Sequence, residues 1–524
     1  MKKTRLTLIG LLLALNLCAQ SYDAWGNEEQ LRKLQIAEVA ITNLYVDTVN
    51  EQKLVEDAIR GMLKALDPHS TYTTAKETKA FTEPMQGSFE GIGIQFNIVQ
   101  DTLLVIQTIT DGPSEKAGLI AGDRIISVDD SLIAGVKMAQ EEIIRRLRGP
   151  KGSLVKLGIA RHGIAEKLYF TVKRDKIPLN TIDASYMIRP RVGYIKIQSF
   201  GATTYKEFIE AVQKLRQEGM KDLIIDLQQN GGGLLQTAVM IANEFLNKND
   251  LIVYTQGRKA SGRQEYRAQG DGTLRQGKVF VLIDEFSASA AEILSGAIQD
   301  QDRGQIVGRR SFGKGLVQRP ITFKDGSMMR LTIAHYYTPS GRCIQKPYTK
   351  GDQLDYALEL DKRYKHGELY SKDSIHLADS TIYYTLRRHR AVYGGGGIMP
   401  DFFVPLDTTQ YTSFHRKLAA QSAIITNTLQ YVDKNREKLR KIYPDFATFN
   451  AKFNPPKDLI QAIVKDGEEA KVKPKDDKEL QETLPMLSLQ VKALVGRDLW
   501  SLTAYFQIMN ETNPIVMKAV RLIE

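Results

Sequence analysis

A chain of 524 residues is long for one domain, so we expect roughly two to four domains and a large buried core. Apolar residues make up 42% of the chain and charged residues 25%, as in an ordinary globular protein. The formal net charge is +11, but the basic excess is diffuse and forms no stripe with interleaved aromatic residues. This distribution argues against nucleic acid as a partner.

The first residues have the pattern of an export signal. Basic residues at positions 2, 3 and 5 precede an apolar stretch, Leu6–Leu17, that is too short to span a bilayer comfortably. Cleavage after Ala19 would make residues 1–19 a signal peptide. We therefore expect a periplasmic protein.

The chain contains two cysteines, Cys18 and Cys343. A lipid-modified cysteine normally follows a small residue, whereas Cys18 follows Leu17, so signal cleavage is favoured over a lipid anchor at Cys18. Removal of the signal would leave Cys343 alone, without an internal disulfide. No recognisable motif surrounds Cys343, which favours a structural thiol over a nucleophile.

An N-terminal helical region is predicted for residues 20–86. Apolar residues recur at helical spacing from Glu28 to Leu66, and Asp67-Pro68 ends the second of two helices. The pattern predicts a helical hairpin. Its apolar faces need a partner, either the body of the protein or another subunit.

The sequence pattern changes at Ser88, where short apolar runs are separated by glycines, as in a small β-rich domain. Helices are predicted at 114–119 and 139–147. Gly91 and Gly93 precede an edge-like strand, and such a loop can offer backbone N–H groups to a carboxylate while the strand pairs with an extended peptide. A β-bulge is the alternative interpretation of these glycines.

The runs GIGIQF, DGPSEKAGLIAGDRIISVDD and GPKGSLVKLGIAR together resemble a PDZ domain of the bacterial protease type, over residues 87–175. In such domains the glycine loop receives the C-terminal carboxylate of a peptide. The resemblance implies a groove whose other wall is the helix at 139–147. It places the peptide-binding residues at Gly91, Ile92, Gly93 and Ile94.

Strands and helices alternate from Ile177 to about Ser340, which predicts an α/β layer fold with a largely parallel sheet. The predicted strands are 192–199, 223–227, 251–254 and 279–284, and the predicted helices are 205–217, 234–246 and 290–299. In such sheets, sites form at the carboxyl ends of strands. Two unusual segments, Asn230–Gly233 and Phe286–Ser289, fall at such ends.

The sequence SASAAE at Ser287 begins the last of these helices. A serine at a helix start is ordinarily an N-cap, and Ser287 fits that interpretation. Ser289 lies inside the first turn, where unpaired N–H groups and the helix dipole favour negative charge. Those are the properties of an oxyanion site beside a nucleophile.

A nucleophilic serine needs a base. Among the histidines, His335 lies in an alternating strand and His69 follows a helix end, so neither is well placed. Lys314 lies between Gly313 and Gly315, beside apolar residues. It would have to be neutral, with its pKa lowered by a desolvated pocket; an exposed loop lysine is the alternative.

The combination of FSASAAEI and GRRSFGKGLVQ resembles the carboxy-terminal processing proteases, which are serine endopeptidases with a Ser–Lys pair and a crotonase-like core. The resemblance implies that Ser289 is the nucleophile and Lys314 the general base. Gln318, one helical turn after the lysine, corresponds to the residue that orients the lysine amine. The likeness runs from about Glu28 to Leu406.

The family's DLR-x-N-P-G-G turn appears here as DLQQNGGG, residues 226–233. Gln228 replaces the usual arginine and Gly231 replaces the usual proline, so the turn lacks the rigidity that proline supplies. The resemblance implies that the N–H groups of Gly232 and Ala290 hold the oxyanion. The acyl-transfer mechanism needs no metal or organic cofactor.

These inferences give a multidomain α/β protein: the N-terminal helices, an inserted PDZ domain, and a crotonase-like protease core over residues 176–406. The core carries an insertion at about 346–393, rich in Tyr, Arg and Lys. Residues 407–524 are expected to be helical, with helices at 414–442, 459–463 and 484–503 and a charged loop at 466–482. The C-terminal helices could clamp the core, wrap a second subunit or bind a partner.

The resemblance implies an exported serine endopeptidase that recognises protein C-terminal tails through its PDZ domain. Expected partners are proteins or peptides with accessible C-terminal tails. An adaptor protein and a second copy, bound through the N- or C-terminal helices, are further candidates. The alternatives are a non-catalytic PDZ scaffold on an inactive protease core, and a crotonase-like hydrolase of small acyl substrates, in which a PDZ domain would be hard to explain.

Overall fold

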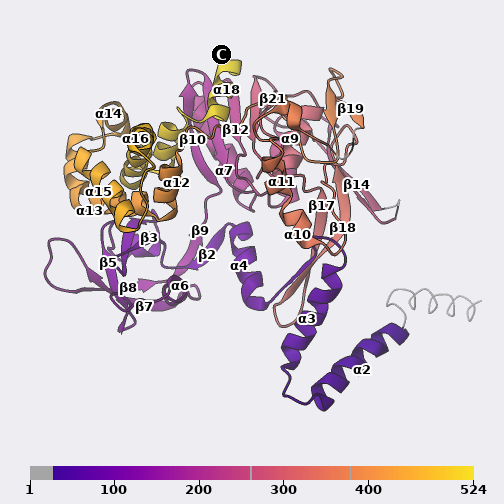
Figure 1. Ribbon diagram of the computed structural model, residues 1–524, viewed down its shortest axis with the longest axis horizontal. Coiled ribbons are helices and arrows are strands. Elements are labelled where there is room, and N and C mark those ends of the chain that lie inside the picture. The colour runs from indigo at the N-terminus through magenta and orange to yellow at the C-terminus, as the bar shows by residue number, and fades with distance from the viewer. Residues whose placement is uncertain (1–27, 260–261, 378, 380) are drawn as a thin grey trace, which may run out of the picture. The chain divides into compact units, whose positions relative to one another are not determined.

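The computed structural model describes residues 28–259, 262–377, 379 and 381–524 (Figure 1). The expected signal peptide, residues 1–19, lies outside the described residues. The chain divides into two compact units. Unit 1 contains the described residues up to Ala75, with 318–332 and 348–356, and unit 2 contains 76–317, 333–347 and 357–524. Within the described part of the chain, no helix is long and apolar enough to cross a membrane.

A six-stranded sheet forms the centre of unit 2, in the order β10-β11-β12-β15-β16-β21. Every neighbouring pair is parallel except β10 and β11. The strands are β10 (Ile182–Arg189), β11 (Val192–Ile197), β12 (Asp222–Asp226), β15 (Val279–Ile283), β16 (Gln305–Gly308) and β21 (Phe402–Phe403). All residues of β11 and β15 are buried, as expected for strands covered on both faces. The prediction of an α/β fold with a largely parallel sheet is confirmed.

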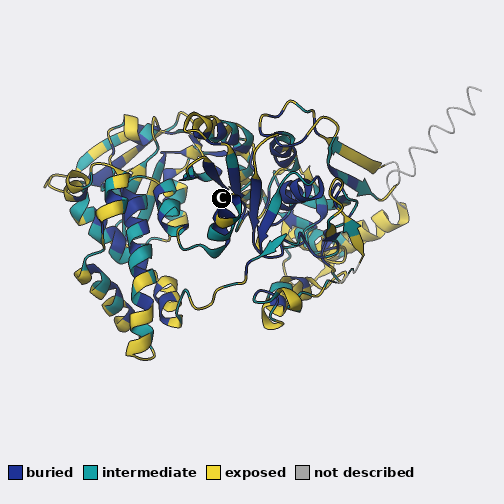
Figure 2. Ribbon diagram, turned by 90° about the horizontal axis from the view of Figure 1, so that it is seen from above, coloured by how far each residue is buried: buried dark blue, intermediate teal, exposed yellow. Residues whose placement is uncertain are grey.

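Helices cover both faces of this sheet. α7 (Thr204–Gln217), α8 (Leu235–Asn243) and α9 (Ala290–Asp300) pack into one core with Ile225 of β12. The neighbouring Ile224 points to the other face, where it joins a core completed by α18 (Pro514–Ile523), which Figure 1 shows beside β12. Buried residues (dark blue in Figure 2) are frequent in these strands and in the helices that pack on them, and two further buried clusters lie elsewhere in the described chain.

A second sheet contains β13 (Leu251–Gly257), β14 (Arg263–Arg267), β17 (Leu316–Thr322) and β18 (Met328–Tyr337). Within unit 2, the end of β18 pairs antiparallel with β13, with Tyr336 opposite Thr255. Within unit 1, the start of β18 pairs with β1 (Thr71–Thr73).

The predicted helices of the N-terminal region are α2 (Glu28–Leu44) and α3 (Glu51–Lys64), followed by α4 (Ala75–Gln86). Along Glu28–Leu44, every residue of which the structure describes, no side chain is buried. In α3 only Leu63 is buried. The apolar faces of these helices are therefore largely exposed.

The segment after α4 forms the small β-rich domain that the sequence predicts. Its strands are β2 (Ser88–Gly91), β3 (Ile94–Val99), β4 (Thr102–Thr108), β5 (Arg124–Val128), β6 (Ser131–Leu132), β7 (Leu154–Ala160), β8 (Leu168–Lys173) and β9 (Asp175–Pro178). Its helices are α5 (Pro113–Lys116) and α6 (Gln140–Leu147). α5 is shorter than predicted because the chain turns at Gly118, whose φ is +94°.

The C-terminal region is a helical bundle of α12 (Ser413–Ala420), α13 (Ala423–Ile442), α14 (Phe446–Lys452), α15 (Lys457–Glu469), α16 (Asp477–Leu499) and α17 (Leu502–Met509). The single helix predicted at 414–442 is broken at Ser422, where φ is +59°. The loop predicted at 466–482 is wrong over most of its length. α15 runs to Glu469, and the Asp476 side chain caps α16 by accepting from the Glu479 N–H.

The insertion after β18 has little regular structure. It contains α10 (Gln353–Ala357), α11 (Glu359–Lys365), a short 3₁₀ helix (Lys372–Ser374) and the hairpin of β19 (Ile382–Tyr384) and β20 (Ala391–Tyr393).

The C-terminal bundle contains a buried histidine, and it should make stability depend on pH. Burial lowers the pKa of His415 below its ordinary 6.5, against the opposing hydrogen bond to Gln490. Because the folded pKa is depressed, this contribution to stability is present above about pH 6.5 and is lost as pH falls through the folded pKa. We expect His415→Gln to lose less stability than wild type between about pH 7.5 and about pH 5.5.

Urea unfolding followed by the fluorescence of Trp500, which packs on Phe449 in the same bundle, measures this difference. A Trp25→Phe background removes the second tryptophan of the chain. Equal losses in the two proteins would contradict the prediction.

Candidate active site

Two turns meet at the carboxyl edge of the central sheet. β12 and β15 are parallel neighbours with Asp226 opposite Leu282, so the segments that follow them leave the sheet side by side. The Ala288 N–H donates to the carbonyl of Asn230 at 2.9 Å. The two unusual segments of the sequence, Asn230–Gly233 and Phe286–Ser289, are therefore in direct contact, as their positions after the strands predict.

Ser287 and Ser289 have different roles in the turn after β15. Ser287 is buried, and its hydroxyl donates to the Leu227 carbonyl at 2.8 Å and accepts from the Asp284 N–H at 2.9 Å. It ties the two turns together, and the interpretation of Ser287 as the helix N-cap is wrong. The N-cap position of α9 is Ser289, whose φ of 57° and ψ of −113° are strained for a residue with a Cβ atom. A sharp, strained turn from strand to helix is how hydrolases expose a serine hydroxyl.

The carboxylate of Glu292, in the first turn of α9, joins Ser289 to the loop that contains Lys314. It is completely buried and accepts four hydrogen bonds. The donors are the N–H groups of Ser289 (2.8 Å), Lys314 (2.9 Å) and Gly313 (2.7 Å) and the hydroxyl of Ser311 (2.6 Å). Burial raises the pKa of Glu292, and these hydrogen bonds oppose the rise. One carboxylate therefore fixes the backbones of both predicted catalytic residues.

Tyr336 of β18 connects the same two residues through their carbonyl groups. Its buried hydroxyl lies 3.1 Å from the carbonyl oxygen of Ser289 and 2.5 Å from that of Lys314. The roles of Glu292 and Tyr336 in joining the two segments were not predicted from the sequence. The only sequence signal was a glutamate three residues after a serine at a helix start, which is also the pattern of an ordinary cap.

The backbone around Lys314 has room only for glycine on either side. Gly313 has a φ of +87°. At Gly315, a Cβ would come within 2.8 Å of the Gln345 backbone N, and the Gly315 N–H donates to the Gln345 side chain at 2.8 Å. The Lys314 side chain is half-buried. The structure thus brings the main chains of Ser289 and Lys314 together, and the general-base role of Lys314 stays a prediction.

The two predicted oxyanion donors differ in their surroundings. Gly232 packs directly on the serine turn, because a Cβ there would come within 2.7 Å of the Ser289 Cβ. However, its N–H already donates to the Asn230 side chain at 2.8 Å, so the Gly232 amide is occupied in this conformation. Ala290 is the first residue of α9, where N–H groups have no acceptor within the helix. Of the two, Ala290 fits the predicted role without rearrangement, whereas Gly232 would have to release Asn230.

Gln318 lies in unit 1, on strand β17, so its predicted position one helical turn after the lysine is wrong. Its side-chain amide donates to the backbone carbonyl of His69. Its proposed function beside a lysine amine stays a prediction.

The predicted peptide-binding residues line a groove between β3 and α6. The groove is mostly apolar, and the Arg148 guanidinium lies at its edge, 4.7 Å from the centre of the Phe89 ring. Gly93 has a φ of +73°, which the turn into β3 requires. The lining residues are Phe89, Gly91, Ile92, Gly93, Ile94, Phe96, Ile144, Leu147 and Arg148.

Comparison with known families assigns most parts of the chain. Residues 191–354 match peptidase family S41, and residues 91–176 match the PDZ domain family. Residues 15–78 match a family described as the N-terminal domain of the activating protease CtpB. Residues 414–501, in the C-terminal bundle, match a family of unknown function.

The similarity to individual proteins extends over most of their length. A carboxy-terminal-processing protease of Bartonella bacilliformis is 35% identical over 345 residues, which are 64% of this chain and 78% of that protein. Carboxy-terminal processing protease CtpA of Bacillus subtilis is 35% identical over 350 residues, 65% of this chain and 74% of that protein. For CtpB of the same organism the identity is 34% over 354 residues, covering 66% of this chain and 72% of the relative.

The shared carboxylate can be tested by Glu292→Gln, which keeps the size of the side chain. The glutamine amide would face N–H donors, and each buried donor left unpaired costs about 1–3 kcal/mol. We expect a loss of about 3 kcal/mol in the free energy of unfolding. The backbone amides of Ser289 and Lys314 should exchange with solvent faster, as measured by hydrogen–deuterium exchange.

Glu210→Gln is the matched control, because that carboxylate is exposed on α7. Unchanged amide protection in Glu292→Gln would show that the carboxylate does not hold the two segments together.

Proposed function

We propose, because the chain belongs to peptidase family S41 and within it to the carboxy-terminal processing proteases, that Ser289 and Lys314 are the catalytic pair of this serine-type peptidase. The family assignment confirms the resemblance drawn from the SASAAE and FGKG sequences. The observation that carries the proposal is the shared binding of the Ser289 and Lys314 amides to one buried carboxylate. A Ser–Lys mechanism needs the lysine amine within reach of the serine hydroxyl, and the shared carboxylate supports the proposal by holding the main chains of the two residues close together.

In the proposed mechanism, neutral Lys314 takes the proton of the Ser289 hydroxyl as its oxygen attacks a peptide carbonyl. The N–H of Ala290 stabilises the oxyanion, joined by that of Gly232 once Asn230 releases it. Lys314 then gives the proton to the leaving amine, and an acyl-enzyme forms on Ser289. Water, deprotonated by Lys314, then attacks the ester; the bond between the acyl carbon and the Ser289 oxygen breaks, Lys314 returns the proton to that oxygen, and the new carboxyl group leaves. No step calls for a metal or an organic cofactor.

We propose that the PDZ groove selects substrates by their C-terminal tails. The loop from Gly91 to Ile94 would receive the tail carboxylate, and the edge of β3 would pair with the tail as an added strand. Apolar side chains from α6 would accept apolar residues of the tail. Occupation of this groove would favour the assembled catalytic pair.

The expected location completes the proposal. Residues 1–19 would direct export, and the mature enzyme would act in the periplasm on proteins with accessible tails, alone or with an adaptor protein.

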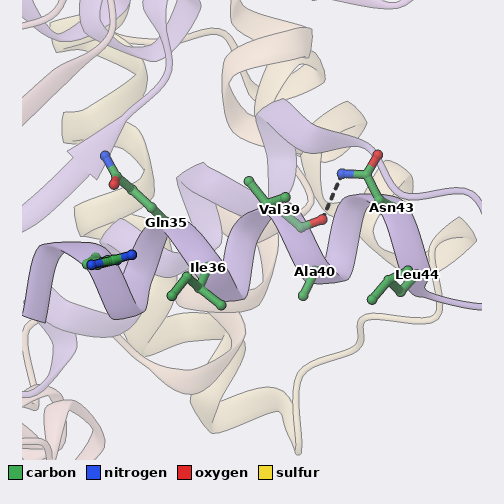
Figure 3. Close-up of a pocket in the computed structure, with 7 residues that line it drawn as sticks. Gln35, Ile36, Val39, Ala40, Asn43 and Leu44 are labelled. Atoms are coloured by element: carbon green, nitrogen blue, oxygen red, sulfur yellow. Dashed lines mark hydrogen bonds between the residues drawn. The ribbon is translucent and has the colours of Figure 1, made fainter. Parts of the chain in front are cut away.

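The exposed face of α2 is proposed to bind a second copy of the chain. Ile36, Ala40 and Leu44 project from one side of the helix (Figure 3). Ile36 is 60% exposed and Leu44 81% exposed, and Val39 adds to the same apolar surface. Such a surface is stable in water only when it is covered. α2 also carries both charge signs, so two antiparallel copies can pair their apolar stripes while their acidic and basic side chains alternate.

The catalytic assignment predicts that Ser289→Ala and Lys314→Met each reduce cleavage of an unstructured peptide with an apolar C-terminus by about 10³-fold or more. The reason is that one substitution removes the proposed nucleophile and the other removes the proposed general base. Peptide cleavage is measured by mass spectrometry. Lys324→Met is the control, because that lysine is exposed in a hairpin turn.

Cleavage that survives both substitutions would refute the Ser–Lys assignment. Tail binding without cleavage by the wild type would instead favour the non-catalytic scaffold. Amidation of the substrate's C-terminus tests the PDZ proposal separately, and we expect it to weaken cleavage.

The proposed self-association predicts that Ile36→Glu combined with Val39→Glu converts a dimer into a monomer. The introduced charges would have to be buried without partners at the interface. Sedimentation velocity measures the mass of both proteins, with Lys33→Gln as a control on an exposed position of α2. A wild type that is monomeric at micromolar concentration would contradict the proposal.

A further inference from the structure

The insertion after β18 contains charged side chains that are almost completely buried. Arg363 is 4% exposed and Glu368 is 5% exposed, and both contact Arg310, which is 4% exposed. Buried charges are costly unless they are paired and hydrogen-bonded. We refer to Arg310, Arg363 and Glu368 as the buried triad. Its location matters because Arg310 immediately precedes the loop that carries Lys314.

Arg363, on α11, uses its guanidinium to hold the main chain of that loop. Its Nε donates to Glu368 at 2.8 Å. Its Nη1 donates to the carbonyl of Ser311 at 3.1 Å and its Nη2 to the carbonyl of Arg310 at 2.7 Å. A planar guanidinium fixes the two carbonyl groups in one relative orientation, which the single point charge of a lysine cannot do.

Glu368 in turn fixes Arg363 and Arg310 against each other. It accepts from Arg310 Nε at 2.6 Å and Arg310 Nη2 at 2.7 Å, in addition to Arg363. Burial by itself would raise the pKa of Glu368, but the hydrogen bonds and charges of the two arginines hold this pKa below its ordinary value. The Glu368 carboxylate therefore stays ionised at neutral pH.

The side chain of Ser311 carries this restraint to the catalytic residues. Its hydroxyl donates to Glu292 at 2.6 Å and accepts from the Ile398 N–H at 2.6 Å, and its own N–H donates to the Ile398 carbonyl at 3.1 Å. Glu292 then binds the amides of Ser289 and Lys314. A continuous path of hydrogen bonds thus leads from Arg363 to both members of the proposed pair.

A second contact from the insertion supports the same loop. Lys346 Nζ lies 3.0 Å from Glu359, at the start of α11, and 4.0 Å from the centre of the Phe312 ring. Phe312 follows Ser311 directly. The insertion therefore contacts two successive residues of the loop, by a guanidinium on the main chain and by a cation on an aromatic face.

We propose that Arg363 is a positioning residue for the Ser289–Lys314 pair, acting through Ser311 and Glu292. The inference rests on the proposed function. Under it, the insertion is a working part of the active site, although Arg363 itself touches neither substrate nor reacting atom. A purely structural role would lower stability and leave the turnover of the folded enzyme unchanged.

The test uses Arg363→Gln and Arg363→Lys in the full-length protein, with Lys365→Gln as the matched control. Lys365 is on the same helix but forms an exposed ion pair with Asp361. We expect Arg363→Gln to lower kcat by about 10²-fold, the effect of a misplacement of about 1 Å, with little change in KM because the PDZ groove is intact. Arg363→Lys keeps the charge and one donor, so its kcat should lie between those of Arg363→Gln and wild type.

Thermal unfolding and active-site titration give the folded fraction, to which each kcat is normalised. If Arg363→Gln does not fold, Arg363→Lys decides. A normalised kcat equal to wild type, or a loss that appears only in KM, would overturn the inference while the proposed function stands. Cleavage by Ser289→Ala at the wild-type rate would instead refute the proposed function. The Ser289 variant thus tests the proposed function, and the Arg363 variants test the further inference.

Discussion

The buried carboxylate of Glu292 is the constraint on which the rest of the site depends. A carboxylate without a counterion is costly to bury, and Glu292 is tolerated because main-chain N–H groups and one hydroxyl surround it. Those donors come from the N-cap of α9 and from the loop between β16 and β17. The hydrogen bonds that offset the free-energy cost of burying this charge also hold the two segments together, because the donors come from both. The same hydrogen bonds therefore contribute to stability and set the geometry of the site.

The restraints around the site form two layers. In the inner layer, Glu292 and Tyr336 connect Ser289 and Lys314 through their amide and carbonyl groups. In the outer layer, the buried triad and Lys346 hold the backbone that leads to Lys314. The contacts of both layers are made largely to main-chain groups of Ser289, Lys314 and the segment between them. Under the proposed function, these restraints on the main chain preorganise the pair.

The sequence predicted the parts of this molecule that follow local rules. The alternation of strand and helix patterns predicted the parallel sheet. The unusual segments that follow β12 and β15 predicted where the candidate site lies. The supporting contacts could not be predicted in this way. Arg363 and Ser311 are 52 residues apart, and nothing in the composition of the insertion distinguishes a buried arginine from an exposed one. The loop expected at 466–482 failed for a related reason, since its charges lie on exposed faces of helices whose apolar residues pack inward.

The covering of the sheet by α18 has a consequence for how the core is assembled. Ile224 of β12 shares its core with Val516 of α18, although almost three hundred positions of sequence separate them. Until that distant helix arrives, one apolar face of the parallel strands stays open to water. Contacts between residues so far apart in the sequence form slowly, and the apolar surface that they cover is exposed to water until they form. The strands that carry the candidate site therefore gain their full covering only once α18 has packed on them.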